Sequence, residues 1–151
     1  MKACQRVNFG FRRLAFFLAA SLLIGAPTAT ACIGFNSKTK QRQSVQEIYR
    51  RNISHPRGYY ANSTYDPTSG RPIIIYYRLY AQAPSYFKSF TRAHECCHHL
   101  GYRNEIAANC CALKQLRLSR GSLAAVRNYI IARNSEFWRK TEQSCPRLAY
   151  R

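Results

Sequence analysis

Residues 94–109 read HECCHHLGYRNEIAAN, and this stretch decides the fold and chemistry that the sequence predicts. It opens with His-Glu-x-x-His, in which His94 and His98 are four residues apart. Positions i and i+4 lie one turn apart on one face of a helix, so both imidazoles can reach one metal ion. Glu95 projects about 100° around the helix, where it can miss the metal and still reach a water molecule. The pattern predicts a Zn²⁺ site with Glu95 as the catalytic base.

Glu105 is the predicted third ligand, because a catalytic zinc site uses three protein ligands and keeps one position open. It begins the next helix after a turn at Gly101. A short connection should make the two helices antiparallel and bring Glu105 opposite His98. The same pairing puts Asn109 level with His94, whose second ring N–H needs an oxygen acceptor.

His94-Glu95-x-x-His98 followed by Asn104-Glu105-x-x-Ala108-Asn109 resembles the gluzincin metallopeptidases. The resemblance covers roughly residues 86–118. It implies a minimal zincin-like core, in which the His-Glu-x-x-His helix and the glutamate helix pack on a small sheet. It also implies hydrolysis of peptide bonds by a water molecule bound to zinc. Cysteines fill both x positions of the first motif, where that family usually has small or apolar residues.

The chain concentrates scarce residue types in this stretch. It has four histidines, three of them within residues 94–99, and six acidic residues, two of which are Glu95 and Glu105. A surface helix with incidental His and Glu is the alternative, and it does not explain this concentration. His99 points away from His98 and is predicted to be a cleft-side or surface histidine.

The remaining pattern predicts an α+β fold. Apolar spacing and capping residues predict helices over residues 44–54, 86–100, 105–118 and 122–140. Residues 73–77 (IIIYY) form the best strand, paired with the preceding tract as a hairpin or as adjacent strands. An exposed edge of that strand is expected to hold an extended peptide substrate.

Six cysteines follow residue 31, and an even number in a short exported chain predicts a disulfide framework. We expect three disulfides, with the first and last cysteines each bonded to one cysteine of a doublet. Cys97 is the alternative metal ligand, and a disulfide is favoured for it. The cysteines concerned are Cys32, Cys96, Cys97, Cys110, Cys111 and Cys145.

Residues 1–31 read as a secretory signal peptide: basic residues without an acid, an apolar run over 14–26, and Ala-Thr-Ala at 29–31. We expect cleavage after Ala31, leaving residues 32–151 as one periplasmic or secreted domain. An uncleaved membrane anchor and a lipoprotein modified at Cys32 are the alternatives. The segment carries four basic residues and no acid, so its removal lowers the formal charge from +18 to +14.

The predicted function is therefore an exported, monomeric zinc peptidase that acts on protein or peptide substrates, which the charge suggests are acidic. The cationic surface also favours anionic envelope polymers or lipid surfaces as partners, and no specific nucleic acid is expected. Two alternatives stay open. One is a non-catalytic cationic zinc-binding module that binds envelope polymers, and the other is a disulfide-rich secreted effector without metal.

Overall fold

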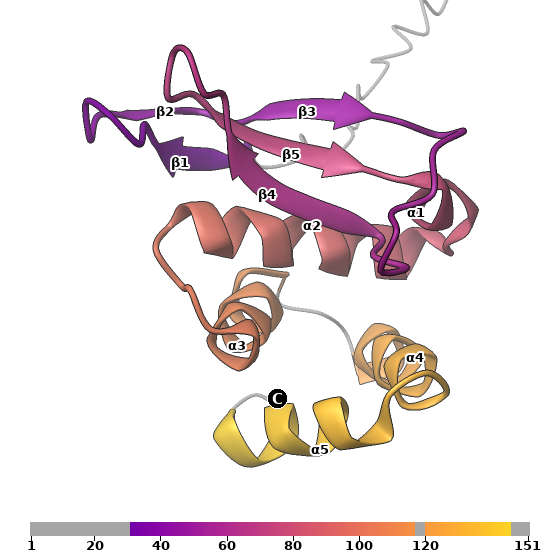
Figure 1. The fold of residues 1–151 in the computed structure, drawn as a ribbon. Helices are drawn as coiled ribbons and strands as arrows, with labels where there is room; N and C mark the ends of the chain where they lie inside the picture. The colour runs from indigo at the N-terminus through magenta and orange to yellow at the C-terminus, as the bar shows by residue number, and fades with distance from the viewer. Residues whose placement is uncertain (1–30, 117–119, 146–151) are drawn as a thin grey trace, which may run out of the picture.

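The computed structural model describes residues 31–116 and 120–145, so nearly all of the predicted signal peptide lies outside the described residues. Within these ranges the chain forms two small sheets and five helices, which confirms the α+β class (Figure 1). The strands are β1 (Ile33–Phe35), β2 (Arg42–Ser44), β3 (Gln46–Tyr49), β4 (Ala61–Tyr65) and β5 (Pro72–Tyr76). The helices are α1 (Arg78–Gln82), α2 (Ser85–His99), α3 (Glu105–Leu116), α4 (Arg120–Ile131) and α5 (Ser135–Ser144).

The main sheet has the strand order β3-β5-β4, with β3 parallel and β4 antiparallel to β5. The predicted hairpin of β4 and β5 is confirmed. The isoleucine run of β5 fits the central strand, which is flanked by a strand on each edge and is buried at four of its five residues. The expectation of a free edge on β5 is therefore wrong, and the free edge on this side of the sheet belongs to β4.

Helix α2 lies between the sheet and the other helices (Figure 1). Its sheet side packs Cys96 into a core with Ile74 and Tyr76. Its opposite side carries Phe90 and Cys97 into a second core shared with α3, α4 and α5. Because both sides of α2 are buried, the position of the motif helix is fixed by the whole domain.

The predicted helix over residues 44–54 is wrong. Residues 42–44 pair with β1 as β2, and residues 46–49 pair with β5 as β3. Val45 lies between them, and its N–H donates to the Cys32 carbonyl at 3.0 Å. Val45 also packs against Ile74, so long-range pairing outweighs the local helical spacing of the apolar residues.

The predicted helix over residues 122–140 is two helices. Asn134 is the N-cap of α5, and its side chain accepts from the Phe137 N–H at 2.9 Å. This asparagine ends one helix and begins another, which lets α5 fold back against α3 and α4.

The three disulfides join Cys32 to Cys96, Cys97 to Cys111, and Cys110 to Cys145. All six cysteines are used, and both terminal cysteines bond to a doublet cysteine, as predicted. The framework fits an extracellular or otherwise oxidising compartment. No helix within the described residues is long and apolar enough to cross a membrane.

Candidate metal centre

The C-terminal half of α2 and the first turn of α3 supply the predicted metal ligands. Gly101 joins them with φ of +100°, a conformation that favours glycine, and its N–H donates to the His98 carbonyl. Asn104 then starts α3, because its side chain accepts from the Ile106 N–H at 2.8 Å. In Figure 1 α2 runs across the view while α3 is seen nearly end-on, so the helices cross rather than run antiparallel as expected.

The crossing still brings the three predicted ligands together. The Glu105 carboxylate lies 3.0 Å from His94 Nε2 and 3.6 Å from His98 Nε2. The two Nε2 atoms are 3.0 Å apart, and one ligand atom from each residue lies within 4.8 Å of the others. The His94 and His98 side chains are 12% and 14% exposed, whereas the Glu105 side chain is 64% exposed. The cluster is therefore anchored in the protein on its histidine side and open to water beside Glu105.

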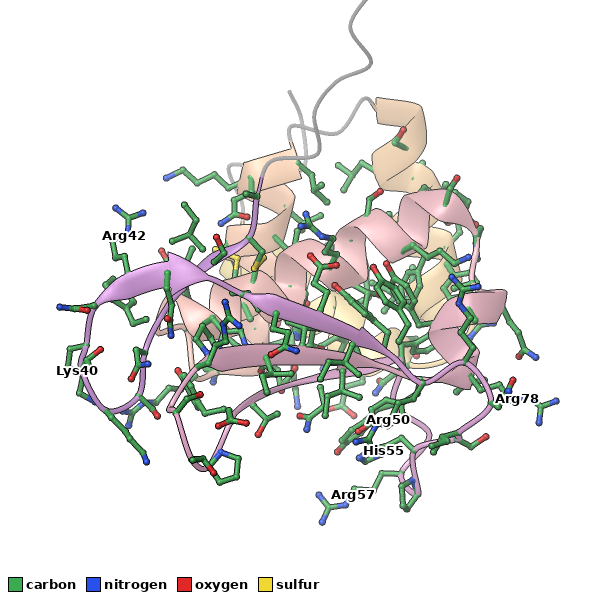
Figure 2. The ribbon with its side chains drawn as sticks, turned by 90° about the horizontal axis from the view of Figure 1, so that it is seen from above. Lys40, Arg42, Arg50, His55, Arg57 and Arg78 are labelled. Atoms are coloured by element: carbon green, nitrogen blue, oxygen red, sulfur yellow. A yellow bond between two sulfur atoms is a disulfide. The ribbon has the colours of Figure 1, made fainter. Side chains whose placement is uncertain are left out.

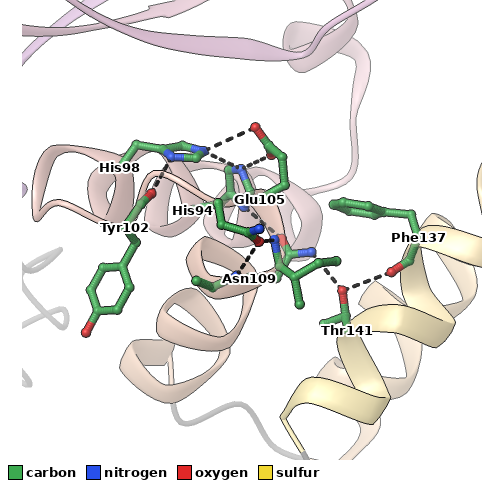
Figure 3. Close-up of polar contacts among 10 residues, drawn as sticks. His94, His98, Tyr102, Glu105, Asn109, Phe137 and Thr141 are labelled. Carbon is green, nitrogen blue, oxygen red and sulfur yellow. Dashed lines mark hydrogen bonds and ion pairs between the residues drawn. The ribbon is translucent and has the colours of Figure 1, made fainter.

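A chain of hydrogen bonds fixes the tautomer of His94 (Figure 3). The Thr141 hydroxyl donates to the Phe137 carbonyl at 3.0 Å, because a carbonyl can only accept. That hydroxyl therefore accepts from the Asn109 amide NH₂ at 2.9 Å, which turns the Asn109 oxygen toward His94. His94 Nδ1, at 2.7 Å from that oxygen, must carry the hydrogen.

His98 is oriented in the same way by the backbone. Its Nδ1 lies 2.7 Å from the Tyr102 carbonyl, which again can only accept (Figure 3). Both histidines therefore carry hydrogen on Nδ1, and in their neutral forms each directs the lone pair of Nε2 into the cluster.

The cluster thus brings three acceptors together without a donor. Two Nε2 lone pairs and the Glu105 carboxylate face one another, and acceptors at these distances repel unless a cation lies among them. A proton or a metal ion meets that need. The arrangement of two imidazoles and one carboxylate, each nitrogen supported by an oxygen acceptor behind it, fits Zn²⁺.

The electrostatics of the cluster reflect the same need for positive charge. When a proton occupies Nε2 of either histidine, that N–H donates to Glu105, and these hydrogen bonds from His94 and His98 hold the pKa of the Glu105 carboxyl far below its usual range. The same hydrogen bond to Glu105 stabilises protonated His98 and raises its pKa, although burial opposes the shift. Glu105 therefore stays a carboxylate, the form that binds metal.

Glu95 lies on the sheet side of the cluster. It is 7% exposed, and burial raises the pKa of its carboxyl, while the charges of His94 and His98 and a hydrogen bond from Ser63 oppose the shift. A carboxylate with a raised pKa accepts and returns protons more readily near neutral pH. The Ser63 contact places Glu95 between the histidines and strand β4.

Asn109 occupies the predicted supporting position, since it is fully buried and hydrogen-bonded to His94.

The expectation that His99 is a cleft-side or surface histidine is wrong. Its side chain is buried, since the residue is 2% exposed, and its Nε2 donates to the Ile73 carbonyl at 2.9 Å. Burial lowers its pKa. Cys97 is bonded to Cys111, so no free thiol stands beside His94.

Sequence reasoning missed three contributors to the site: the Thr141 hydroxyl, the Tyr102 carbonyl and the Ser63 hydroxyl. Thr141 lies 32 residues from Asn109 on α5, and no spacing links the two.

No protein-family model, no curated protein and no solved structure matches this chain.

Proposed function

We propose that the protein is a zinc-dependent peptidase whose metal site is His94, His98 and Glu105. The observation that carries this proposal is the convergence of three acceptor groups: Nε2 of His94, Nε2 of His98 and the Glu105 carboxylate. The tautomer of each histidine is set by a partner outside the cluster. A surface histidine pair without a ligand would not need a buried asparagine behind one ring and a directed carbonyl behind the other.

Zinc in this site would polarise the carbonyl of the scissile bond and lower the pKa of a water molecule. Glu95 accepts the proton of the attacking water and delivers it to the leaving amine. The exposed side of Glu105 leaves room for a substrate, while the buried Asn109 and Thr141 keep the histidines in place.

Strand β4 is the surface along which an extended peptide would bind. At the two ends of the ladder, Tyr77 N–H donates to the Tyr60 carbonyl and Asp66 N–H donates to the Arg71 carbonyl. Bonding alternates along an antiparallel strand, so every second residue directs its N–H and C=O away from β5. The residues with outward backbone groups are Ala61, Ser63 and Tyr65. The side chain of Ser63 also forms a hydrogen bond with the proposed base Glu95.

The Glu95→Gln variant tests the catalytic step. Glutamine has the same shape and cannot take a proton, so hydrolysis of a protein substrate should fall about 10²–10⁴-fold while zinc content stays unchanged. Glu136→Gln is the matched control, because Glu136 lies on α5 and pairs with Lys140 at 2.8 Å. Both variants and the parent are compared for zinc by atomic absorption and for release of peptides by mass spectrometry.

Bound zinc with hydrolysis that does not depend on Glu95 would contradict the assigned role of this residue. Bound zinc without any hydrolysis would favour the non-catalytic zinc-binding module. Absence of zinc from protein purified with intact disulfides would favour the effector without metal.

A further inference from the structure

The loop between β3 and β4, residues 50–59, forms a basic and partly apolar surface at the end of the sheet beside α1. We propose that this loop surface, defined by Arg50, Arg51, Ile53, Arg57, Tyr59 and Arg78, docks the protein on membranes rich in anionic phospholipid. This inference goes beyond the proposed peptidase activity, since it uses none of the residues of the metal centre.

The loop is held in place before any partner binds. The Arg50 N–H donates to the Tyr76 carbonyl at 2.7 Å, and the Arg78 N–H donates to the Ile53 carbonyl at 2.9 Å. Within the loop, the Gly58 N–H donates to the His55 carbonyl at 2.9 Å. Because the backbone is already ordered by these bonds, binding costs little conformational entropy in the loop.

The charges on this surface are exposed and all of one sign. Figure 2 shows Arg50, His55, Arg57 and Arg78 gathered at one end of the sheet, with Lys40 and Arg42 far from them at the other. Residues 48–65 contain no acid. The acid next in sequence, Glu47, is bonded to Arg92 at 2.6 Å and accepts from the Tyr49 hydroxyl. The carboxylate of Glu47 is therefore already engaged by other side chains and does not neutralise the loop.

The apolar residues of the loop favour a bilayer over a soluble polyanion. Ile53 is 50% exposed and Tyr59 is 46% exposed, and the Tyr59 ring stacks on His55 with ring centres 4.6 Å apart. An exposed isoleucine can neither stack on a base nor bond to a sugar, and it gains only by entering an apolar medium. Tyrosines and arginines are well suited to the interface between lipid and water, where each keeps its polar end hydrated.

The loop surface and the metal centre lie apart. The loop meets the sheet at the C-terminal ends of β3 and β5, beside α1, whereas the ligands lie where α2 meets α3 (Figure 1). The chain could therefore rest on a membrane through the loop with the Glu105 side of the metal centre still open to water.

The test uses exported protein with its disulfides formed and measures partition onto vesicles by flotation. One set of vesicles is phosphatidylcholine alone, and the other contains about a third phosphatidylglycerol. The parent should bind only the second set. Each arginine near an anionic surface contributes about fivefold to partition, so Arg50→Gln, Arg57→Gln and Arg78→Gln combined should weaken binding about a hundredfold.

The matched control removes the same charge elsewhere through Arg42→Gln, Arg71→Gln and Lys114→Gln, all at exposed positions. It should weaken binding only a few-fold, because its charges act from a distance that salt screens. Ile53→Ser keeps every charge and should weaken binding about tenfold. All variants share one N-terminus, so any contribution from residues 1–31 cancels.

Three results would overturn the proposal. Equal losses in the two triple variants would show attraction to net charge rather than to this loop. Unchanged binding by Ile53→Ser would show that Ile53 does not enter the bilayer and would favour a soluble polyanion as the partner. Equal binding to both vesicle compositions would show that anionic lipid is not recognised. Circular dichroism of each variant confirms that the fold is retained.

Discussion

At the scale of single residues, the direction of hydrogen bonds says more about the site than the distances among its ligands. The Phe137 carbonyl can only accept, and this fact propagates through Thr141 and Asn109 to set the hydrogen on the His94 ring. The Tyr102 carbonyl can also only accept, and it sets the hydrogen on the His98 ring directly. The sequence motif names the ligands, whereas this network shows that their lone pairs point at one another.

Replacing Thr141 by valine tests the network. Valine keeps the volume and cannot accept from the Asn109 amide, so Asn109 loses the partner that orients it. Loss of a hydrogen-bond partner that orients a metal-binding side chain typically weakens metal affinity 10–100-fold. Competition with a chromogenic zinc chelator measures that affinity, and Thr141→Ser, which keeps the hydroxyl, should restore most of it. Equal zinc affinity in the valine and serine variants would show that Thr141 only fills space.

At the scale of elements, α5 supports the candidate metal centre, because it supplies Thr141, whose hydroxyl accepts from the Asn109 amide. Its start depends on Asn134, whose side chain caps the helix at the Phe137 N–H. Asn134→Ala should therefore lower the free energy of unfolding by about 1 kcal/mol. Urea denaturation measures the change. Asn134→Ser can still cap and should lose much less, and an equal loss in both variants would argue against the cap.

The sequence predicts the elements whose determinants are local. The α2 helix, its stop at Gly101, the start of α3 at Glu105 and strand β5 all follow from periodicity and capping residues nearby in the chain. Residues 44–49 have equally good local helical spacing and form strands, because residues 46–49 pair with β5, which lies beyond β4 in the sequence. The same reason hides Thr141, since no local pattern announces a contact made across 32 residues.

At the scale of the whole molecule, the disulfides join the parts that build the candidate metal centre. Cys32–Cys96 ties the chain just before β1 to α2, Cys97–Cys111 ties α2 to α3, and Cys110–Cys145 ties α3 to the end of α5. The ligand helices are thus held from three directions in a domain whose modest size limits its apolar core.

The loss of stability on removing a disulfide should increase with the length of chain that the disulfide closes. Cys32 and Cys96 are separated by 64 residues, and Cys97 and Cys111 by 14. On chain-entropy grounds, the double alanine variants should lose about 4 and about 3 kcal/mol of stability, respectively. Denaturant titration gives both values, and the reverse order would show that packing around the bridges outweighs chain entropy.

Loss of the Cys97–Cys111 disulfide should leave zinc bound in the fraction that stays folded, because neither sulfur is assigned as a ligand. Atomic absorption of the folded fraction of that double alanine variant, separated by gel filtration, measures this. Folded protein without zinc would contradict the separation between the disulfide framework and the ligand set.

The central claim is that His94, His98 and Glu105 hold one zinc ion, and X-ray absorption at the zinc edge tests it most directly. We predict one zinc per chain, with only nitrogen and oxygen neighbours at about 2.0–2.2 Å and the scattering pattern of two imidazoles. Glu105→Ala should reduce zinc content severely, while Glu136→Ala, which removes an equal charge from α5, should not change it. A sulfur neighbour at about 2.3 Å, or full zinc occupancy in the Glu105→Ala variant, would contradict the account.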